Sequence, residues 1–398
     1  MRFLIVAIFS LLTVISILFI DGCRPKEDKS NLVNKHADND DLGHIAALPD
    51  SVVYPADNPQ SIDKIELGRL LFYDPILSGD KDVACASCHH PEFMYAESQE
   101  ISIGVNGKGL SERRKFLPRN SIPFTKRNAQ TVLNTAFNGI DLQLKYRPEE
   151  APMFWDLRAK SLEEQALLPI KSLEEMRGTK YKEAEILDVV RRRLSSNAIY
   201  RQLFRKAFPG SAEINIDLVA KALANFQRSL VANNSRFDRY MRGDATAMTA
   251  REIEGMKLFV ATGCARCHSG PMLSDFKPHV LGIVDNEKLS FSDSGINGTY
   301  AFRTPSLRNL RFTRPYMHNG KIQTLENVLT FYDDLNGKDP LNKNVQPEKI
   351  DSLARKLKVE FKNINAIIEF LNALNDDKYD RKIPSVVPSG LPVGGNIK

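Results

Sequence analysis

Apolar residues recur at helical spacing in several separate stretches of the chain, and strict alternation of apolar and polar residues is scarce. This pattern predicts helices over residues 62–73, 181–208, 216–230, 325–335 and 364–374. Thr249 and Glu252 form a capping-box sequence, which predicts the start of one more helix. The stretches 97–130 and 269–303 follow neither period, and we interpret them as long loops. The pattern therefore predicts an all-α fold with long loops.

The N-terminal residues have the pattern of an export signal. An apolar run over residues 3–20 leads to Cys23 in a sequence that resembles a lipoprotein processing site, so we interpret residues 1–23 as a signal or lipoprotein segment. Asp21 is atypical in such a site, and an uncleaved anchor is the alternative because about 18 apolar residues can just span a bilayer. Residues 24–48 are polar, and we interpret them as a flexible tether. Both alternatives place the rest of the chain in the periplasm, with membrane contact only through the N-terminal lipid or anchor.

Composition excludes several classes of protein. The chain has 398 residues, of which 42% are hydrophobic and 26% are charged, so it is neither disordered as a whole nor a multi-span membrane protein. This length is sufficient for two domains. A net charge of +6 is mild for such a chain, and we expect no nucleic-acid partner.

The four cysteines that follow Cys23 are arranged in two C-x-x-C-H motifs. The motifs are Cys85-Ala-Ser-Cys88-His89 and Cys264-Ala-Arg-Cys267-His268. In this pattern the two thiols form thioether bonds to the vinyl groups of a c-type haem, and the histidine is the proximal iron ligand. A zinc site uses Cys pairs with other partners and spacing, and a thioredoxin-like pair does not need the histidine. The sequence therefore predicts two covalently bound haem c groups.

The two motifs divide the exported chain into two cytochrome-c-like haem domains. We expect an N-terminal domain over residues 49–232 and a C-terminal domain over residues 233–385, followed by a tail over residues 386–398. Residues 233–243 are polar, and we interpret them as the connector at the domain boundary. The two domains show no sequence repeat beyond the haem motif, and we expect the long loops 97–130 and 269–303 to wrap around the haems.

The remaining histidines bear on whether the protein is an electron carrier or an enzyme. A carrier fills both faces of each iron, whereas an enzyme leaves one face open to its substrate. His36 and His44 lie in the predicted tether, and His90 directly follows a haem ligand, so we interpret it as a surface residue. His279 lies in a loop, and His318 lies in a turn-rich sequence. None of them is an evident second ligand for the first haem.

From about residue 49 to residue 378 the chain resembles the bacterial di-haem cytochrome c peroxidases, the family that also includes MauG. The matching sequences are Leu67-Gly-Arg-Leu-Leu-Phe-Tyr-Asp-Pro75, both haem motifs, Ser102-Ile-Gly104, Arg127-Asn128-Ala, Phe154-Trp155-Asp156, Ser161-Leu-Glu-Glu-Gln165-Ala, Arg303-Thr-Pro-Ser-Leu-Arg-Asn309 and Pro315-Tyr-Met-His318-Asn-Gly320. The haem motifs alone are not specific, but their combination with the last sequence is. The resemblance implies a pair of cytochrome domains, with peroxide reduction at the N-terminal haem and electron entry through the C-terminal haem.

The same resemblance assigns three residues to the reaction. Trp155, the only tryptophan of the chain, matches the tryptophan between the haems of the family. Gln165 and Glu175 match the pair on the open side of the peroxidatic haem. A carboxylate near the iron can take a proton from one peroxide oxygen and return it to the other, which is what peroxide cleavage requires.

The resemblance also implies a calcium site between the domains. Its ligands would be Asn128 and the backbone oxygens of Thr313 and Pro315. Oxygen ligands are those that a hard cation such as calcium prefers. An amide and two carbonyl groups have no recognisable signature of their own, so this site rests on the resemblance alone.

Two positions depart from the peroxidases that rest in a closed state. Where those enzymes have a histidine ligand to the N-terminal haem, this chain has Val105, which cannot bind iron. Where they have a methionine ligand to the C-terminal haem, this chain has Tyr332, as MauG does. Met317, Met272 and Tyr316 are alternative ligands nearby. Both departures predict a peroxide site that is open at rest.

Three functions remain to be compared. The first is a peroxidase that reduces hydrogen peroxide with electrons from a small cytochrome c or cupredoxin. The second is a MauG-type enzyme that uses peroxide to oxidise residues of a partner protein, and the third is an electron carrier. Val105 argues against the carrier. The basic stretch 113–127 could dock an acidic donor, although a solvated loop explains it equally well, and a homodimer is left open.

Overall fold

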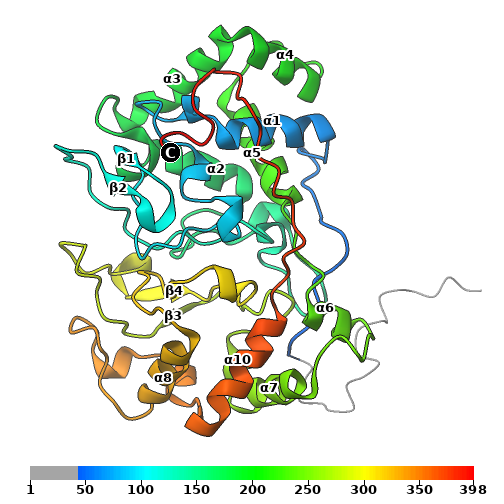
Figure 1. The fold of residues 1–398 in the computed structure, drawn as a ribbon, viewed down its shortest axis with the longest axis vertical. Helices are drawn as coiled ribbons and strands as arrows, with labels where there is room; N and C mark the ends of the chain where they lie inside the picture. Colours follow the sequence, from blue (N-terminus) through cyan, green and yellow to red (C-terminus); the bar gives the residue numbers. More distant parts are fainter. Residues whose placement is uncertain (1–43) are drawn as a thin grey trace, which may run out of the picture.

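The computed structural model describes residues 44–398, so the predicted signal segment 1–23 and most of the predicted tether lie outside the described residues. In this described part of the chain, ten α-helices and two small antiparallel sheets of two strands each are joined by long irregular segments and short 3₁₀ turns (Figure 1). The helices are α1 (Ile62–Tyr73), α2 (Leu162–Lys171), α3 (Glu183–Ser196), α4 (Ala198–Ala207), α5 (Ile216–Ser229), α6 (Arg236–Met241), α7 (Ala250–Ala261), α8 (Leu325–Asp334), α9 (Ser352–Arg355) and α10 (Ile364–Ala373), and the strands are β1 (Gly107–Lys108), β2 (Lys115–Phe116), β3 (Pro278–Val280) and β4 (Ala301–Arg303). The prediction of a mostly helical fold with long loops is confirmed.

The predicted helices are present with small changes at their ends. The stretch 181–208 forms two helices instead of one, because Asn197 interrupts it and caps α4 by accepting hydrogen bonds from the backbone N–H groups of Ile199 and Tyr200 (2.9 and 3.0 Å). The capping box at α7 is formed: the Thr249 hydroxyl accepts from the Glu252 N–H (3.2 Å), and the Glu252 carboxylate accepts from the Thr249 N–H (2.8 Å).

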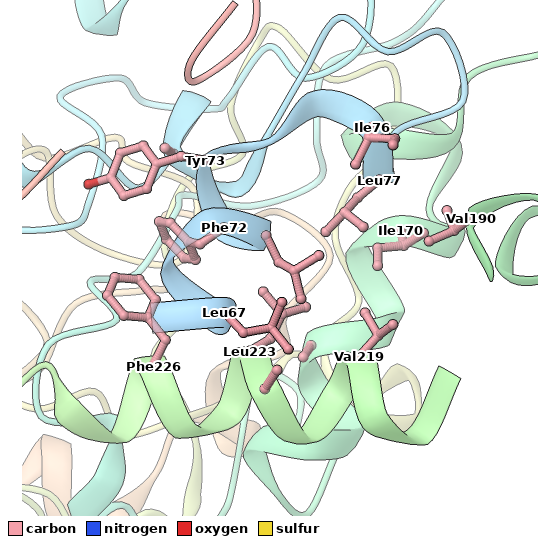
Figure 2. Packing of buried hydrophobic residues seen from close by; sticks show 14 of the residues in the cluster. Leu67, Phe72, Tyr73, Ile76, Leu77, Ile170, Val190, Val219, Leu223 and Phe226 are labelled. Atoms are coloured by element: carbon pink, nitrogen blue, oxygen red, sulfur yellow. The ribbon is translucent and has the colours of Figure 1, made fainter. Parts of the chain in front are cut away.

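The first hydrophobic core lies in the N-terminal half of the chain, where α1 packs against α5. Leu67 and Phe72 on α1 lie next to Leu223 and Phe226 on α5 (Figure 2), with the Phe72 and Phe226 rings 5.2 Å apart in an edge-to-face arrangement. A Cβ atom at Gly68 would overlap the backbone oxygen of Ala222 on α5. The glycine therefore allows the two helices to approach this closely.

The second core repeats this arrangement in the C-terminal half. Here α7 packs against α10, and Phe259 and Phe370 lie 5.2 Å apart. A Cβ atom at Gly255 would overlap the backbone oxygen of Ala366 on α10. Gly68 and Gly255 each begin the sequence Gly-x-x-Leu-Phe, on the helix that precedes a haem motif. This is a second similarity between the two halves, which the sequence analysis overlooked.

Several segments expected at the surface are instead buried. Ile45 and Leu48, at the end of the predicted tether, pack into hydrophobic clusters. The predicted polar connector contains α6, and Asp238 of that helix forms a fully buried ion pair with Arg308 (2.8 and 2.9 Å). His90, predicted at the surface, is only 5% exposed. The burial of Ile45, Leu48 and Asp238 depends on contacts with residues far away in the sequence, which local polarity does not reveal.

The C-terminal segment also differs from a loose tail. After α10 it runs from the second half of the molecule back to the first (Figure 1). Val387 is buried in the first core, and Gly395 forms an antiparallel bridge with Val83 just before the first haem motif. The Ser87 hydroxyl donates to the Gly394 carbonyl (2.8 Å). The C-terminal segment therefore packs against the first haem motif.

Candidate functional site

One cavity of about 770 Å³ is lined by both haem motifs. The residues of the motifs that line it are Cys85, Cys88, His89, Cys264, Cys267 and His268. The two motifs adopt the same local conformation, a 3₁₀ turn in which the histidine N–H donates to the carbonyl of the first cysteine (2.9 Å in both). The fold thus presents two equivalent attachment units to one cavity.

The two motif histidines are oriented in the same way. Nδ1 of His89 is hydrogen-bonded to the Tyr95 carbonyl, and Nδ1 of His268 to the Leu273 carbonyl, both at 3.0 Å. A bond of this kind fixes the tautomer and leaves Nε2 free to bind a metal. Burial lowers the pKa of His89 and lowers that of His268 to about 4, so both rings are neutral, as ligands must be.

The residues around the cavity fit two c-type haems. All four motif cysteines are free thiols. The buried guanidinium of Arg303 lines the cavity. Its only hydrogen-bond acceptors among residues 44–398 are neutral oxygens, those of the Phe154 carbonyl (2.7 Å) and the Gln130 side chain (3.0 Å). Burial lowers its pKa to about 10. A buried cation without an acidic partner suits the propionate groups of a haem.

Gln165 and Glu175 come from different elements and line this cavity together with the first haem motif. Gln165 lies on α2, and Glu175 lies on the π-helical turn Leu173–Arg177 that follows it. Burial raises the pKa of Glu175 to about 7; Glu174 and Asp156 also raise it, while Arg158 and Lys126 act in the opposite direction. A carboxyl group with this pKa can both accept and donate a proton near neutral pH.

Val105 is not among the residues that line the cavity. Its side chain is 2% exposed and belongs to the first hydrophobic core, and its N–H donates to the Glu174 carbonyl (3.2 Å). The loop that carries this position therefore lies behind the turn of Glu175. The placement agrees with a first haem that has an open side.

Trp155 also lines the cavity, and its backbone and side chain are both fixed. Its indole N–H donates to the Asn128 carbonyl (3.0 Å), and its own carbonyl accepts from the Arg303 N–H (2.8 Å). The indole lies edge-to-face with the His318 ring at 6.5 Å, and His318 stacks on Phe302 at 3.6 Å. These aromatic rings form a contiguous group beside the cavity.

Tyr332 on α8 lines the cavity near the second haem motif. Burial and the nearby Cys264 and Cys267 raise the pKa of its hydroxyl, so a bound cation would be needed to hold it as a phenolate. Met272 and Met317 line the same cavity. Tyr316 is a poorer candidate because its hydroxyl already donates to the Leu310 carbonyl (3.0 Å).

Comparison with known proteins identifies the family. The family model described as di-haem cytochrome c peroxidase matches residues 62–246. Cytochrome c551 peroxidase of Nitrosomonas europaea is 32% identical over 338 residues, which cover 83% of this chain and 85% of that protein. The chain belongs to the di-haem cytochrome c peroxidase family. It is thus an oxidoreductase with two covalently bound haems, in a family that acts on hydrogen peroxide with a cytochrome donor.

The chain is also similar to MauG itself and to a MauG-like protein. Methylamine utilization protein MauG of Methylorubrum extorquens is 36% identical over 304 residues, covering 74% of this chain and 76% of that protein. Among solved structures, a MauG-like protein associated with microbial copper homeostasis is 27% identical, with a TM-score of 0.67, covering 83% of this chain and 95% of that one. The protein is thus a di-haem peroxidase or a MauG-like enzyme.

The predicted calcium ligands of this di-haem protein lie around the same cavity. Asn128, Thr313 and Pro315 all line it. The Asn128 side-chain N–H₂ group donates to the Gln99 carbonyl (2.8 Å), which leaves its oxygen as the ligand atom. The backbone of Asn128 accepts from Trp155, so a cation here would be coupled to the tryptophan.

The sequence analysis missed a charged group beside the second haem motif. His279 lies between two carboxylates: Nδ1 is 2.7 Å from Asp351, and Nε2 is 3.1 Å from Asp275. These bonds, with the nearby Cys267, raise the pKa of His279 to about 11. Cys267, Asp275 and His279 lie close enough to hold a metal, but the haem takes the thiol and both ring nitrogens are occupied. Asp351 is remote in sequence, so no local pattern signals the cluster.

The basic stretch 113–127 is less available for docking than its charge suggests. Arg114 is fully buried, and Arg127 pairs with Asp156 and Asp293 (both 2.6 Å). Arg113, Lys115, Arg119 and Lys126 remain exposed, so four of its six basic residues are still available.

Among residues 44–398, no helix is long and apolar enough to cross a membrane.

Proposed function

We propose that this protein reduces hydrogen peroxide to water on the open side of the His89 haem, with electrons that enter at the His268 haem. The observation that carries the proposal is the contrast around the first motif. Glu175 and Gln165 line the cavity, whereas Val105, at the position of a closing ligand, lies outside the lining. The site thus offers acid–base groups without a protein ligand at position 105.

The chain's own residues would position peroxide and move its proton. When bound, the haem supplies electrons to the oxygen–oxygen bond. In our proposal Glu175 would take the proton from one peroxide oxygen and return it to the other, which leaves as water, while Gln165 would orient the peroxide by hydrogen bonding. The pKa of Glu175, near 7, suits both steps because neither protonation state is strongly favoured.

The electrons would come from a small cytochrome c or cupredoxin and reach the first site by way of Trp155. The fixed position of Trp155 beside the cavity supports this role, since its indole and carbonyl are both hydrogen-bonded. We further propose export to the periplasm and a calcium ion at Asn128, Thr313 and Pro315. We also retain the division into two haem domains near residue 233.

A MauG-type function is the second candidate. In this case the enzyme would store two oxidising equivalents and use them on residues of a partner protein. Tyr332 favours it, because an anionic oxygen ligand stabilises the higher oxidation states of iron, unlike a thioether. Its place beside Cys264 and Cys267 in the cavity supports the assignment.

The test of an open site is the resting state of the fully oxidised protein. We expect a high-spin ferric signal from one haem and a reaction with peroxide that needs no prior reduction. Electron paramagnetic resonance and stopped-flow absorption measure the two properties. Two low-spin haems, with no peroxide reaction until one is reduced, would reject the proposal and would mean that another side chain binds the first iron.

A further inference from the structure

The turn that carries Glu175 is enclosed by two loops that approach it through glycine. On one side, the Gly79 N–H donates to the Met176 carbonyl (2.8 Å), and a Cβ atom at Gly79 would overlap the Arg177 carbonyl. On the other side, a Cβ atom at Gly104 would overlap the carbonyl oxygens of the turn, including that of Glu175. Backbone thus packs directly on backbone at both sides of the turn.

Arg114 fixes the loop of Gly104 from within the protein. Its side chain is fully buried. It donates to the carbonyls of Ile103, Gly104 (2.7 Å) and Gly109 (3.0 Å), and no ion pair of the described residues involves it. A buried guanidinium must have its donors satisfied, and here backbone oxygens of a single loop provide most of the partners.

Arg193 on α3 fixes the loop of Gly79 in the same manner. Its guanidinium donates to the carbonyls of Ile76 (3.0 Å), Ser78 and Gly79 (2.8 Å). Two arginines from different parts of the chain therefore perform the same task on opposite sides of one turn. Each cross-links a loop that has no regular secondary structure at the contact.

The C-terminal segment extends the first of these cross-links. The Asn396 carbonyl accepts from the Gly109 N–H (2.9 Å) and from Arg114 (3.3 Å), and the Asn396 N–H donates to the Asp82 carbonyl (2.8 Å). The Asp82 carboxylate in turn accepts from the Asn106 N–H (2.9 Å). The loop behind Glu175 is therefore held from three directions.

We propose that Arg114 and Arg193 are positioning residues for Glu175, which hold its turn at the cavity wall by cross-linking the two glycine loops. The inference rests on the proposed acid–base role of Glu175. Lysine cannot replace either residue fully, because its three donors radiate from one nitrogen whereas the guanidinium fork reaches several carbonyls at once. A shift of about 1 Å in a catalytic group can lower the rate roughly 10²-fold, which makes such a support functionally important.

The test compares Arg114→Lys and Arg193→Lys with a control, Arg242→Lys. Arg242 also donates to two carbonyls, those of Leu48 (2.7 Å) and Asn233 (2.8 Å), but lies away from the turn. We expect each of the first two variants to react with peroxide about tenfold to a hundredfold more slowly. The control should match the wild type, and the absorption spectrum of the His268 haem should be the same in all three.

The pH profile distinguishes positioning from a general loss of stability. Burial is the main cause of the raised pKa of Glu175, so a displaced turn should move the midpoint of the peroxide reaction below about 7. General destabilisation would lower the amount of holoprotein without moving this midpoint. If Arg114→Lys fails to accumulate, Arg193→Lys carries the test, because Arg193 is only partly buried.

The Glu175→Gln variant distinguishes the proposed role of Glu175 from the positioning role of the two arginines. If it reacts at the wild-type rate, the proposed role of Glu175 is wrong. If it is slow while both arginine variants keep the wild-type rate and midpoint, the role of Glu175 stands and the positioning inference is overturned. If all three are slow and only the arginine variants show a shifted midpoint, both are supported.

Discussion

The two haem motifs share their local conformation and differ in the other residues that line the cavity with each of them. His89 and His268 have the same turn and the same Nδ1 bond to a carbonyl, with the same distance. Gln165 and Glu175, a carboxyl group with a pKa of about 7, line the cavity with the first motif, and Tyr332 lines it near the second. The comparison indicates that the attachment unit is generic, and in our proposal residues far from each motif determine the chemistry of its haem.

The largest expected effect concerns the residues that line the cavity with the first haem motif. Glu175→Gln should slow the reaction with peroxide about 10²–10⁴-fold, because the amide cannot transfer the proton. Stopped-flow absorption of the oxidised protein measures this rate. Glu183→Gln is the matched control, since Glu183 also lines the cavity but is exposed and pairs with Lys171 (3.1 Å). Equal rates for the two variants would assign proton transfer to another residue.

The next effect concerns whether the two halves are separate units. Arg308→Met leaves the buried carboxylate of Asp238 without its ion pair and should destabilise the second half by ~3–5 kcal/mol. Arg228→Met is the counterpart in the first half, where Arg228 pairs with Glu163. Thermal unfolding by calorimetry should show two transitions, with each variant lowering a different one. A single transition lowered by both would show that the halves unfold together.

The third prediction tests whether Tyr332 is the ligand of the His268 haem. Tyr332→Met should raise the potential of the His268 haem by on the order of 0.1 V, within the ~0.8 V range that axial ligands set. Spectroelectrochemistry measures the potential. Tyr316→Phe should leave it unchanged, because the Tyr316 hydroxyl binds the Leu310 carbonyl. An unchanged potential in Tyr332→Met would transfer the ligand role to Met317 or Met272 and favour an ordinary peroxidase.

The smallest expected effect is the pH dependence of the peroxide reaction at the first haem. In the proposed mechanism Glu175 acts on peroxide as a base, so only its deprotonated form is active, and the fraction of this form increases as pH rises through about 7. The rate should therefore rise about tenfold between one pH unit below the pKa and one unit above it. Stopped-flow rates at constant ionic strength test this. A rate that falls over the same interval would contradict the proposed base.

Local sequence features predicted what local interactions determine. The α1 and α7 helices follow from apolar spacing and a capping box, and the haem motifs need only five adjacent residues. Gly68 and Gly255 also had a visible signal, because Gly-x-x-Leu-Phe occurs twice, but a single sequence does not show that both glycines face a second helix. The resemblance supplied Gln165 and Glu175, and the structure brings them to the same cavity.

Features that depend on distant partners could not be predicted. The cluster around His279 needs Asp351, which lies 72 positions away in the sequence. Arg114 lies in a basic stretch whose charge is typical of a solvated loop. It is nevertheless buried, and its guanidinium donates to the carbonyls of Gly104 and Asn396. Similarly, α6 lies in a polar stretch and contains Asp238, which is buried only because Arg308 binds it. Charge alone does not distinguish a surface residue from a buried cross-link.

The route of the C-terminal segment has a consequence for how the first half of the molecule folds. The Ser87 hydroxyl and the Gly394 carbonyl that accepts from it lie 307 positions apart in the sequence. Contacts of such large separation require the closure of a long loop and form slowly. We therefore expect the contacts of the C-terminal segment with Val83 and Ser87 to form late in folding, after the more local contact of α1 with the haem motif that follows it.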